Sequence, residues 1–147
     1  MTRRQSGQAL VEWAASTFVL LLFALGILAV GQVVSQYMAV RSAASQAAFA
    51  AARAPSEAAA EQSANAAAEE AIRGAQLEDF RLAIDSPGFQ RGGVLTATAS
   101  GYVNLSYFPI VSQVLGSRLQ LSWQAHALVE PYRSRTVRQE ALRNHVG

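Results

Sequence analysis

The chain has 147 residues, of which 51% are hydrophobic and 15% charged, with a net charge of +2 and no cysteine. This length holds one compact domain at most, which excludes a multidomain enzyme. The absence of cysteine excludes a disulfide framework, a thiolate zinc site and a cysteine nucleophile. The charges are also unevenly placed, because residues 13–40 contain none. This distribution predicts a membrane segment that carries a small polar domain.

The uncharged stretch is long enough to cross a bilayer as a helix. At about 1.5 Å per residue it would measure about 42 Å, whereas a hydrocarbon core of about 30 Å needs only about 20 residues. Ten of the residues from Phe18 to Val30 are Val, Leu, Ile or Phe, which favour insertion. We therefore predict a transmembrane helix over residues 8–40. The side chains expected to anchor it in the membrane are Trp13, Phe18, Leu21, Leu22, Phe23, Ile27 and Leu28.

The charges that flank this span predict its orientation. Arg3 and Arg4 precede it, and no acidic residue occurs before Glu12. Because positively charged flanks stay on the cytoplasmic side, the N-terminus is expected to be cytoplasmic and the residues after about 40 extracytoplasmic. A conventional cleaved signal peptide is the alternative, with an Ala-x-Ala site at residues 48–50. The apolar stretch is longer than the 7 to 15 residues usual in such signals, and Glu12 stands where it should begin, so we favour a retained helix.

The segment from Gly7 to Trp13 is the most informative part of the sequence. Glu12 stands among apolar residues, and an acid at the bilayer centre costs about 3 kcal/mol, so it needs a partner or an interfacial position. One interpretation is that Glu12 marks the cytoplasmic interface, with Trp13 as an aromatic anchor. The arrangement also resembles a type IV prepilin signal, in which a short basic leader ends in Gly and the apolar helix carries Glu as its fifth residue. Counted from Gln8, Glu12 is the fifth residue.

The string Gly-Gln-Ala-Leu-Val-Glu, followed by an aromatic residue and a Leu-rich span, resembles the TadE-like proteins, minor pseudopilins of bacterial tight-adherence (Tad) pilus systems. The resemblance covers residues 3–34. It implies that a prepilin peptidase cuts after Gly7 and leaves Gln8 as the new N-terminus. It also implies a single-pass protein of the bacterial cytoplasmic membrane, whose partners are the lipid bilayer, other pilin or pseudopilin subunits and the platform proteins of pilus assembly.

Cleavage after Gly7 would give Glu12 a physical role. The new ammonium group of Gln8 would lie about one helical turn from the Glu12 carboxylate, so the two charges could compensate each other within one subunit or between neighbours. Such pairing would favour insertion into an assembly. We therefore expect Gly7 and Gln8 to be the cleavage residues and Glu12 to be the residue that pairs with the N-terminus.

An Ala-rich helical stalk is predicted over residues 41–75, with a break near 54–56. Pro55 disfavours a helical conformation at Ala54, and Ser56 is expected to cap a second helix that Gly74 closes. Arg73 is expected to pair with Glu69, four residues earlier. Small residues recur at every fourth position, which either permits close helix packing or arises by chance from the high Ala content. They are Gly31, Ser35, Ala39, Ala43, Ala47 and Ala51.

A small extracytoplasmic, β-rich domain is predicted over residues 76–132. Apolar and polar residues alternate over 95–106 and 119–130, which is the period of half-buried strands, and a shorter strand is expected over 79–85. A turn at Pro87–Gly88 and a loop at 90–93 would follow the first strand, and a short helix from Pro109 to Leu115 would precede the last. The predicted fold is therefore α+β: a long transmembrane helix continuing into a helical stalk, then an antiparallel sheet of about three strands packed against helix. Such a domain is expected to be marginally stable without partner subunits.

The sequence contains no recognisable catalytic or cofactor-binding motif. His126 falls on the polar face of a strand, and the neighbouring acids Glu69–Glu70 and Glu78–Asp79 are expected to point apart, as on a helix. The basic tail at residues 133–147 lacks interleaved aromatic residues, so no nucleic acid is predicted as a partner. We therefore predict no enzyme activity, no metal and no cofactor, and favour a structural or assembly component of a Tad-type pilus. The alternative is an uncleaved, membrane-anchored binding module, and an enzyme with an unrecognised site is the third class.

Overall fold

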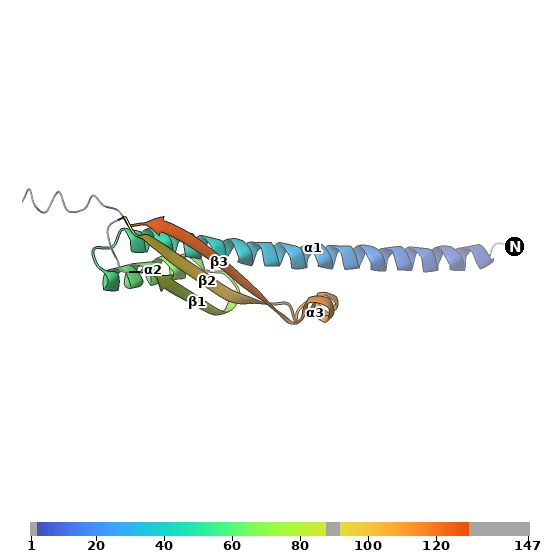
Figure 1. Ribbon diagram of the computed structural model, residues 1–147. Helices are drawn as coiled ribbons and strands as arrows, with labels where there is room; N and C mark the ends of the chain where they lie inside the picture. The colour runs from blue at the N-terminus through green and yellow to red at the C-terminus, as the bar shows by residue number, and fades with distance from the viewer. Residues whose placement is uncertain (1–2, 88–91, 130–147) are drawn as a thin grey trace, which may run out of the picture.

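The computed structural model describes residues 3–87 and 92–129, and the side chains from Gly7 onward (Figure 1). Several expectations fall outside these residues, namely those for residues 1–2 of the leader, for Gly88, for residues 90–91 and for the tail at 133–147. The elements are α1 (Arg3–Ala52), α2 (Glu57–Ala71), β1 (Leu77–Asp85), β2 (Val94–Asn104), α3 (Pro109–Leu115) and β3 (Arg118–Leu128).

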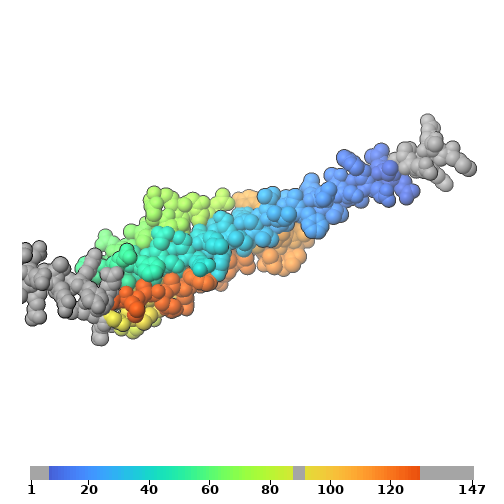
Figure 2. All heavy atoms as spheres, turned by 90° about the horizontal axis from the view of Figure 1, so that it is seen from above, coloured from blue at the N-terminus to red at the C-terminus, as the bar shows by residue number. Residues whose placement is uncertain are grey.

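Helix α1 is an uninterrupted helix of 50 residues. Its sequence is rich in Leu and Ala and contains no proline, so nothing in it stops the helix before Ala52. At about 1.5 Å per residue it is about 75 Å long, well over twice the thickness of a bilayer core of about 30 Å. Figures 1 and 2 show its N-terminal part projecting beyond α3, while its C-terminal half lies along the sheet and α2.

The break between α1 and α2 has the expected cause. Helix α1 ends before Pro55, and Ser56 caps α2, its Oγ accepting a hydrogen bond from the backbone N–H of Ala59 at 3.3 Å. The predicted N-cap is therefore confirmed. At the other end, α2 stops at Ala71, earlier than predicted, and Gly74 adopts a positive φ of 86° in the turn that follows.

The predicted ion pair of Arg73 at the end of α2 forms with a different acid. Arg73 pairs with Glu70, not with Glu69. The physical reason is that Arg73 lies beyond the last helical turn, so the four-residue spacing that would align it with Glu69 no longer holds.

The three strands form an antiparallel sheet in the order β1-β2-β3. Leu82 of β1 lies opposite Ala99 of β2, which in turn lies opposite Trp123 of β3. Helix α1 lies across β2 and β3, and α2 lies against α1 on the side of β1 (Figure 1). The predicted α+β class, with a three-stranded antiparallel sheet packed against a long N-terminal helix, is confirmed.

The core lies between this sheet and the two helices. The alternating pattern of β2 is confirmed from Leu95 onward, where its apolar residues are buried and its polar residues are half-buried on the other face. Small residues line the contact between the helices. Of the predicted row of small residues, only the C-terminal half is fully buried within the fold, whereas Gly31 and Ser35 are exposed. The residues that fill the core include Val40, Ala43, Ala47, Ala51, Ala60, Ala64, Ala68, Leu95, Val103 and Leu105.

Candidate functional site

The N-terminal half of α1 is an exposed apolar surface. Trp13, Phe18 and Ile27 are 70%, 63% and 70% exposed. In the described part of the chain, α1 is the one helix long and apolar enough to cross a membrane, with a mean hydropathy of 2.5 over its best window, of which 6% is buried. An apolar surface of this extent needs lipid or protein to cover it. Of the seven expected anchor residues, Leu22 is half-buried and the other six are exposed.

The residues of the predicted cleavage site lie in the first turns of this helix. Gly7 is open on all sides, since a Cβ atom added there would meet no atom within 4 Å. Gln8 and Glu12 are four residues apart on one helix, so they lie on the same face about one turn from each other. Next to Glu12, the carbonyl of Trp13 accepts a hydrogen bond from Thr17 Oγ1 at 2.9 Å. The structure thus places the three predicted residues on an exposed, accessible segment.

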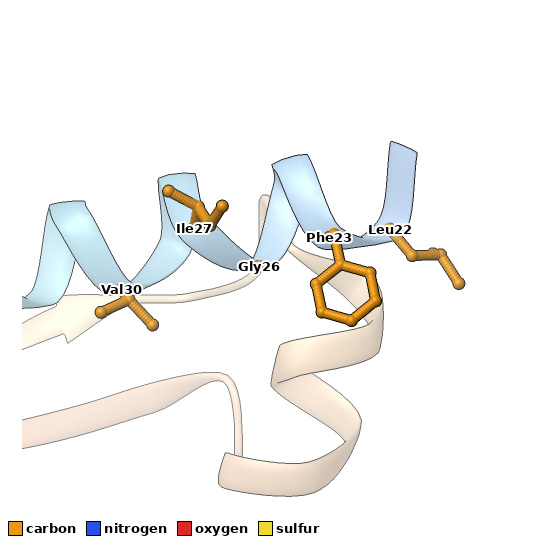
Figure 3. A pocket seen from close by; sticks show the side chains of 5 residues that line it. All are labelled: Leu22, Phe23, Gly26, Ile27 and Val30. Atoms are coloured by element: carbon orange, nitrogen blue, oxygen red, sulfur yellow. The ribbon is translucent and has the colours of Figure 1, made fainter. Parts of the chain in front are cut away.

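A shallow apolar hollow lies further along the same helix, around Gly26 (Figure 3). It is lined by Leu22, Phe23, Gly26, Ile27 and Val30. The absence of a side chain at Gly26 recesses the helix surface between its larger neighbours.

A second and more enclosed pocket shares Leu22 and Gly26 with this hollow. Its other wall consists of residues 107–111, at the start of α3. Helix α3 therefore lies beside the apolar half of α1. The sequence gives no signal for this contact, because Tyr107 lies 81 positions after Gly26.

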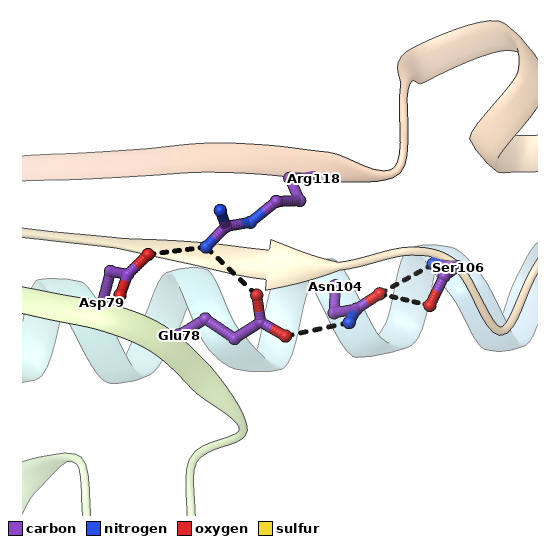
Figure 4. Close-up of polar contacts among 5 residues, drawn as sticks. All are labelled: Glu78, Asp79, Asn104, Ser106 and Arg118. Atoms are coloured by element: carbon purple, nitrogen blue, oxygen red, sulfur yellow. Dashed lines mark hydrogen bonds and ion pairs between the residues drawn. The ribbon is translucent and has the colours of Figure 1, made fainter.

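A polar cluster on the outer face of the sheet joins all three strands (Figure 4). From β3, Arg118 Nη2 lies 3.1 Å from Glu78 Oε2 and 2.6 Å from Asp79 Oδ2, both on β1. Asn104 of β2 donates from Nδ2 to Glu78 Oε1 at 2.8 Å. The guanidinium of Arg118 also lies 4.8 Å from the ring centre of Tyr102. The hydrogen bond to Asp79 is the main cause that raises the pKa of Arg118 above its usual value.

The expectation that neighbouring acids point apart is wrong for Glu78 and Asp79. They lie on a strand, and the register of β1 shifts between Glu78 and Arg81, where Asp79 has a positive φ of 50°. This β-bulge turns both carboxylates toward Arg118. The cluster joins the strand ends and is partly exposed, so we assign it a structural role.

His126 lies exposed on the outer face of β3, where its Nδ1 is 2.9 Å from the hydroxyl oxygen of Thr96, its cross-strand neighbour. Among residues 3–87 and 92–129, no group of three His, Asp or Glu side chains is arranged to hold a metal ion. Among the described residues, the surface that needs a functional explanation is therefore the apolar N-terminal half of α1, together with Gly7, Gln8 and Glu12.

One comparison with known proteins matches the same segment. Residues 7–48 match the family model described as TadE-like protein. No curated protein and no solved structure matches the chain. The matched residues run from the open glycine at the start of α1 into the part of the helix that packs on the sheet.

Proposed function

We propose that the chain is a TadE-like minor pseudopilin, a membrane-anchored structural subunit of a bacterial Tad pilus, because residues 7–48 match the TadE-like family model. The observation that carries this proposal is the exposed apolar half of α1, which begins with Gly7, Gln8 and Glu12. Lipid would cover this surface before assembly. Helices of other pilin or pseudopilin subunits would cover it in the assembled state.

The proposed arrangement in the membrane follows from burial along α1. Its side chains are exposed or half-buried from Gly7 to Leu28, and from Ala29, which is 2% exposed, the rest of the chain begins to cover one side of the helix. Residues 8–28 are therefore the proposed lipid-facing part. With the N-terminus in the cytoplasm, the sheet and α2 would lie outside the cytoplasmic membrane, where they can meet other subunits and the assembly platform.

Processing after Gly7 by a prepilin peptidase is the first step to test. The full chain is expressed with its own Tad peptidase, extracted from membranes and analysed by intact mass and N-terminal sequencing. We expect Gln8 as the N-terminus of the native protein. A Gly7→Val variant should be heavier by the leader, because a branched side chain then occupies the open position at the cleavage site.

Gly31→Val is the matched control, because Gly31 is an equally open glycine of α1 outside the leader. It should be processed like the native chain. A native membrane protein that keeps Met1 or Thr2 at its terminus would contradict the proposal and leave the uncleaved binding module as the better description.

The role proposed for Glu12 needs a separate test. We expect Glu12→Ala to leave the amount of membrane-inserted protein unchanged, because it removes a charge from an apolar helix. The fraction recovered with pilus assembly components after mild solubilisation should fall, because the Gln8 ammonium loses its partner. Glu61→Ala, at an exposed acid of α2, is the control. Equal recovery of the Glu12 variant and the native chain would refute pairing at this residue.

A further inference from the structure

The connection between β2 and β3 carries an unusual concentration of exposed apolar side chains. Tyr107 and Val114 are both 79% exposed, and Ile110 and Leu115 are 54% and 57% exposed. These four residues are called the α3 cluster below. No charged residue occurs between Arg91 and Arg118. A soluble protein seldom exposes such a group of apolar residues without a partner for it.

The α3 cluster lies beside the part of α1 that is proposed to face lipid. Residues 107–111 line a common pocket with Leu22, Leu25 and Gly26. Figure 1 shows α3 beyond the end of the sheet, alongside the apolar half of α1, and Figure 3 shows its ribbon next to Leu22 and Phe23. The exposed apolar surfaces of α1 and α3 are therefore continuous with each other.

The position of α3 along the helix places it at the depth of the hydrocarbon. At about 1.5 Å per residue, Gly26 lies about 21 Å from Glu12 along the axis, and the hydrocarbon core is about 30 Å thick. With Glu12 at the cytoplasmic interface, Gly26 and the neighbouring α3 fall within the outer half of the bilayer. A charged connection would be costly at this position.

Several backbone groups of this connection are paired within it. The N–H of Leu105 donates to the carbonyl of Ser117 at 2.8 Å, which closes the base of the connection. The N–H of Phe108 donates to Leu105 and that of Ser112 to Phe108, while the Ser112 hydroxyl donates to the Pro109 carbonyl at 3.0 Å. Pairing of these backbone groups lowers the cost of placing them in hydrocarbon. The polar cluster around Arg118 follows directly, at the start of β3.

We propose that the α3 cluster inserts into the outer leaflet of the membrane that α1 spans. Its partner is the acyl-chain region of the lipid bilayer, argued from its continuity with the lipid-facing surface of α1 and from the depth of Gly26. The inference rests on the proposed membrane anchoring. It adds a second contact with lipid, which holds the extracytoplasmic domain at a defined height and orientation on the membrane.

Single nitroxide labels test this placement, and the absence of cysteine from the chain makes each introduced cysteine the sole labelling site. The full chain is reconstituted in vesicles of phosphatidylethanolamine and phosphatidylglycerol. Collision of the label with oxygen, which concentrates in lipid, is compared with collision with a water-soluble nickel chelate. Val114→Cys and Tyr107→Cys report on the α3 cluster. Leu20→Cys, on exposed α1, is the lipid control, and Gln124→Cys, on the exposed outer face of β3, is the aqueous control.

We expect the ratio of oxygen to nickel accessibility at both cluster positions to be several-fold higher than at Gln124 and close to that at Leu20. A ratio at the cluster equal to that at Gln124, with Leu20 still in lipid, would overturn the inference and leave the membrane anchor intact. Low accessibility to both reagents would also overturn it, because the cluster would then be covered by protein. A nickel-accessible Leu20 would refute the proposed membrane anchoring and this inference with it.

Discussion

Gln36 is a polar side chain in an otherwise apolar part of α1. It is 6% exposed, and its amide oxygen has no hydrogen-bond partner among the described residues. Its position one turn before Val40 places it at the edge of the core. An unsatisfied buried polar atom costs about 1–3 kcal/mol, so Gln36 is expected to lower the stability of the folded domain.

We predict that Gln36→Met raises the free energy of unfolding by about 1 kcal/mol, because a flexible apolar side chain of similar size fills the same space without an unpaired oxygen. Urea unfolding of the full chain in mild detergent, followed by Trp123 fluorescence in a Trp13→Phe background, measures the change. Gln46→Met, at an exposed glutamine of the same helix, should change it by less than about 0.5 kcal/mol. A destabilised Gln36 variant would show that the amide oxygen makes a favourable contact.

Trp123 illustrates what can be predicted for one residue. Its place on the apolar face of the last strand follows from the alternating pattern. Its partners do not, because its ring packs edge-on against Tyr37 at a centroid distance of 5.8 Å, and Arg41 lies 5.2 Å from its centre. Both partners come from α1. The hydropathy of this helix predicts a membrane span up to residue 40, so it does not predict that Tyr37 packs against the sheet.

At the scale of elements, the contact between α1 and α2 depends on alanine. Ala60, Ala64 and Ala68 recur at every fourth position of α2 and are buried against the core. Such small side chains let two helix backbones approach closely, but each buries little apolar area. The contact is therefore sensitive both to added volume and to the local stability of α2.

Ala64→Leu should destabilise the fold by about 1–3 kcal/mol, because the larger side chain must enter a fully packed contact. Leucine and alanine are both good helix formers, so loss of helix propensity does not explain such an effect. Ala66→Leu, at an exposed position of the same helix, is the matched control and should unfold at a urea midpoint close to that of the native chain. Equal midpoints for the two variants would show that α2 does not pack tightly on α1.

Ser56→Ala should lower the free energy of unfolding by about 1 kcal/mol, since the N–H of Ala59 loses the side chain that accepts its hydrogen bond. Ser56→Asn retains a capping side chain and should stay close to the native value. Thermal unfolding followed by circular dichroism measures both variants. An unchanged melting temperature for Ser56→Ala would indicate that packing alone defines the start of α2.

At the scale of the whole molecule, the chain consists of an apolar half helix and a folded domain that shares the rest of that helix. The buried core cluster of the described residues begins at Val40, with Val33 and Tyr37 packed at its edge. Between Gly7 and Leu28 no side chain is fully buried. The domain is therefore expected to fold without the N-terminal half of α1.

A chain shortened to residues 28–147 should stay in the supernatant after ultracentrifugation without detergent, and should unfold cooperatively, because it keeps the complete core. The same chain with Ala64→Leu is the control, and it should unfold at a lower urea concentration. A non-cooperative transition in the shortened chain would show that the apolar half of α1 contributes to the folded domain.

The sequence by itself determined the number and order of the main elements. Three local signals were enough: the long uncharged stretch, Pro55 followed by its capping serine, and the alternation of apolar and polar residues along the strands. Each depends only on residues that are close in the sequence. The residues expected at the cleavage site were likewise recognised from one short segment, and the structure adds only that this segment is exposed.

Only the tertiary structure decided which surfaces meet. The polar cluster forms only because of the β-bulge at Asp79 and the register of the three strands. The α3 cluster is proposed to contact lipid because it lies beside Gly26 of α1. Neither can be inferred from local patterns, because a pattern states which face of an element is apolar but not which distant element covers it. The length of α1 that remains outside the core was decided in the same way, by where the sheet packs and not by hydropathy.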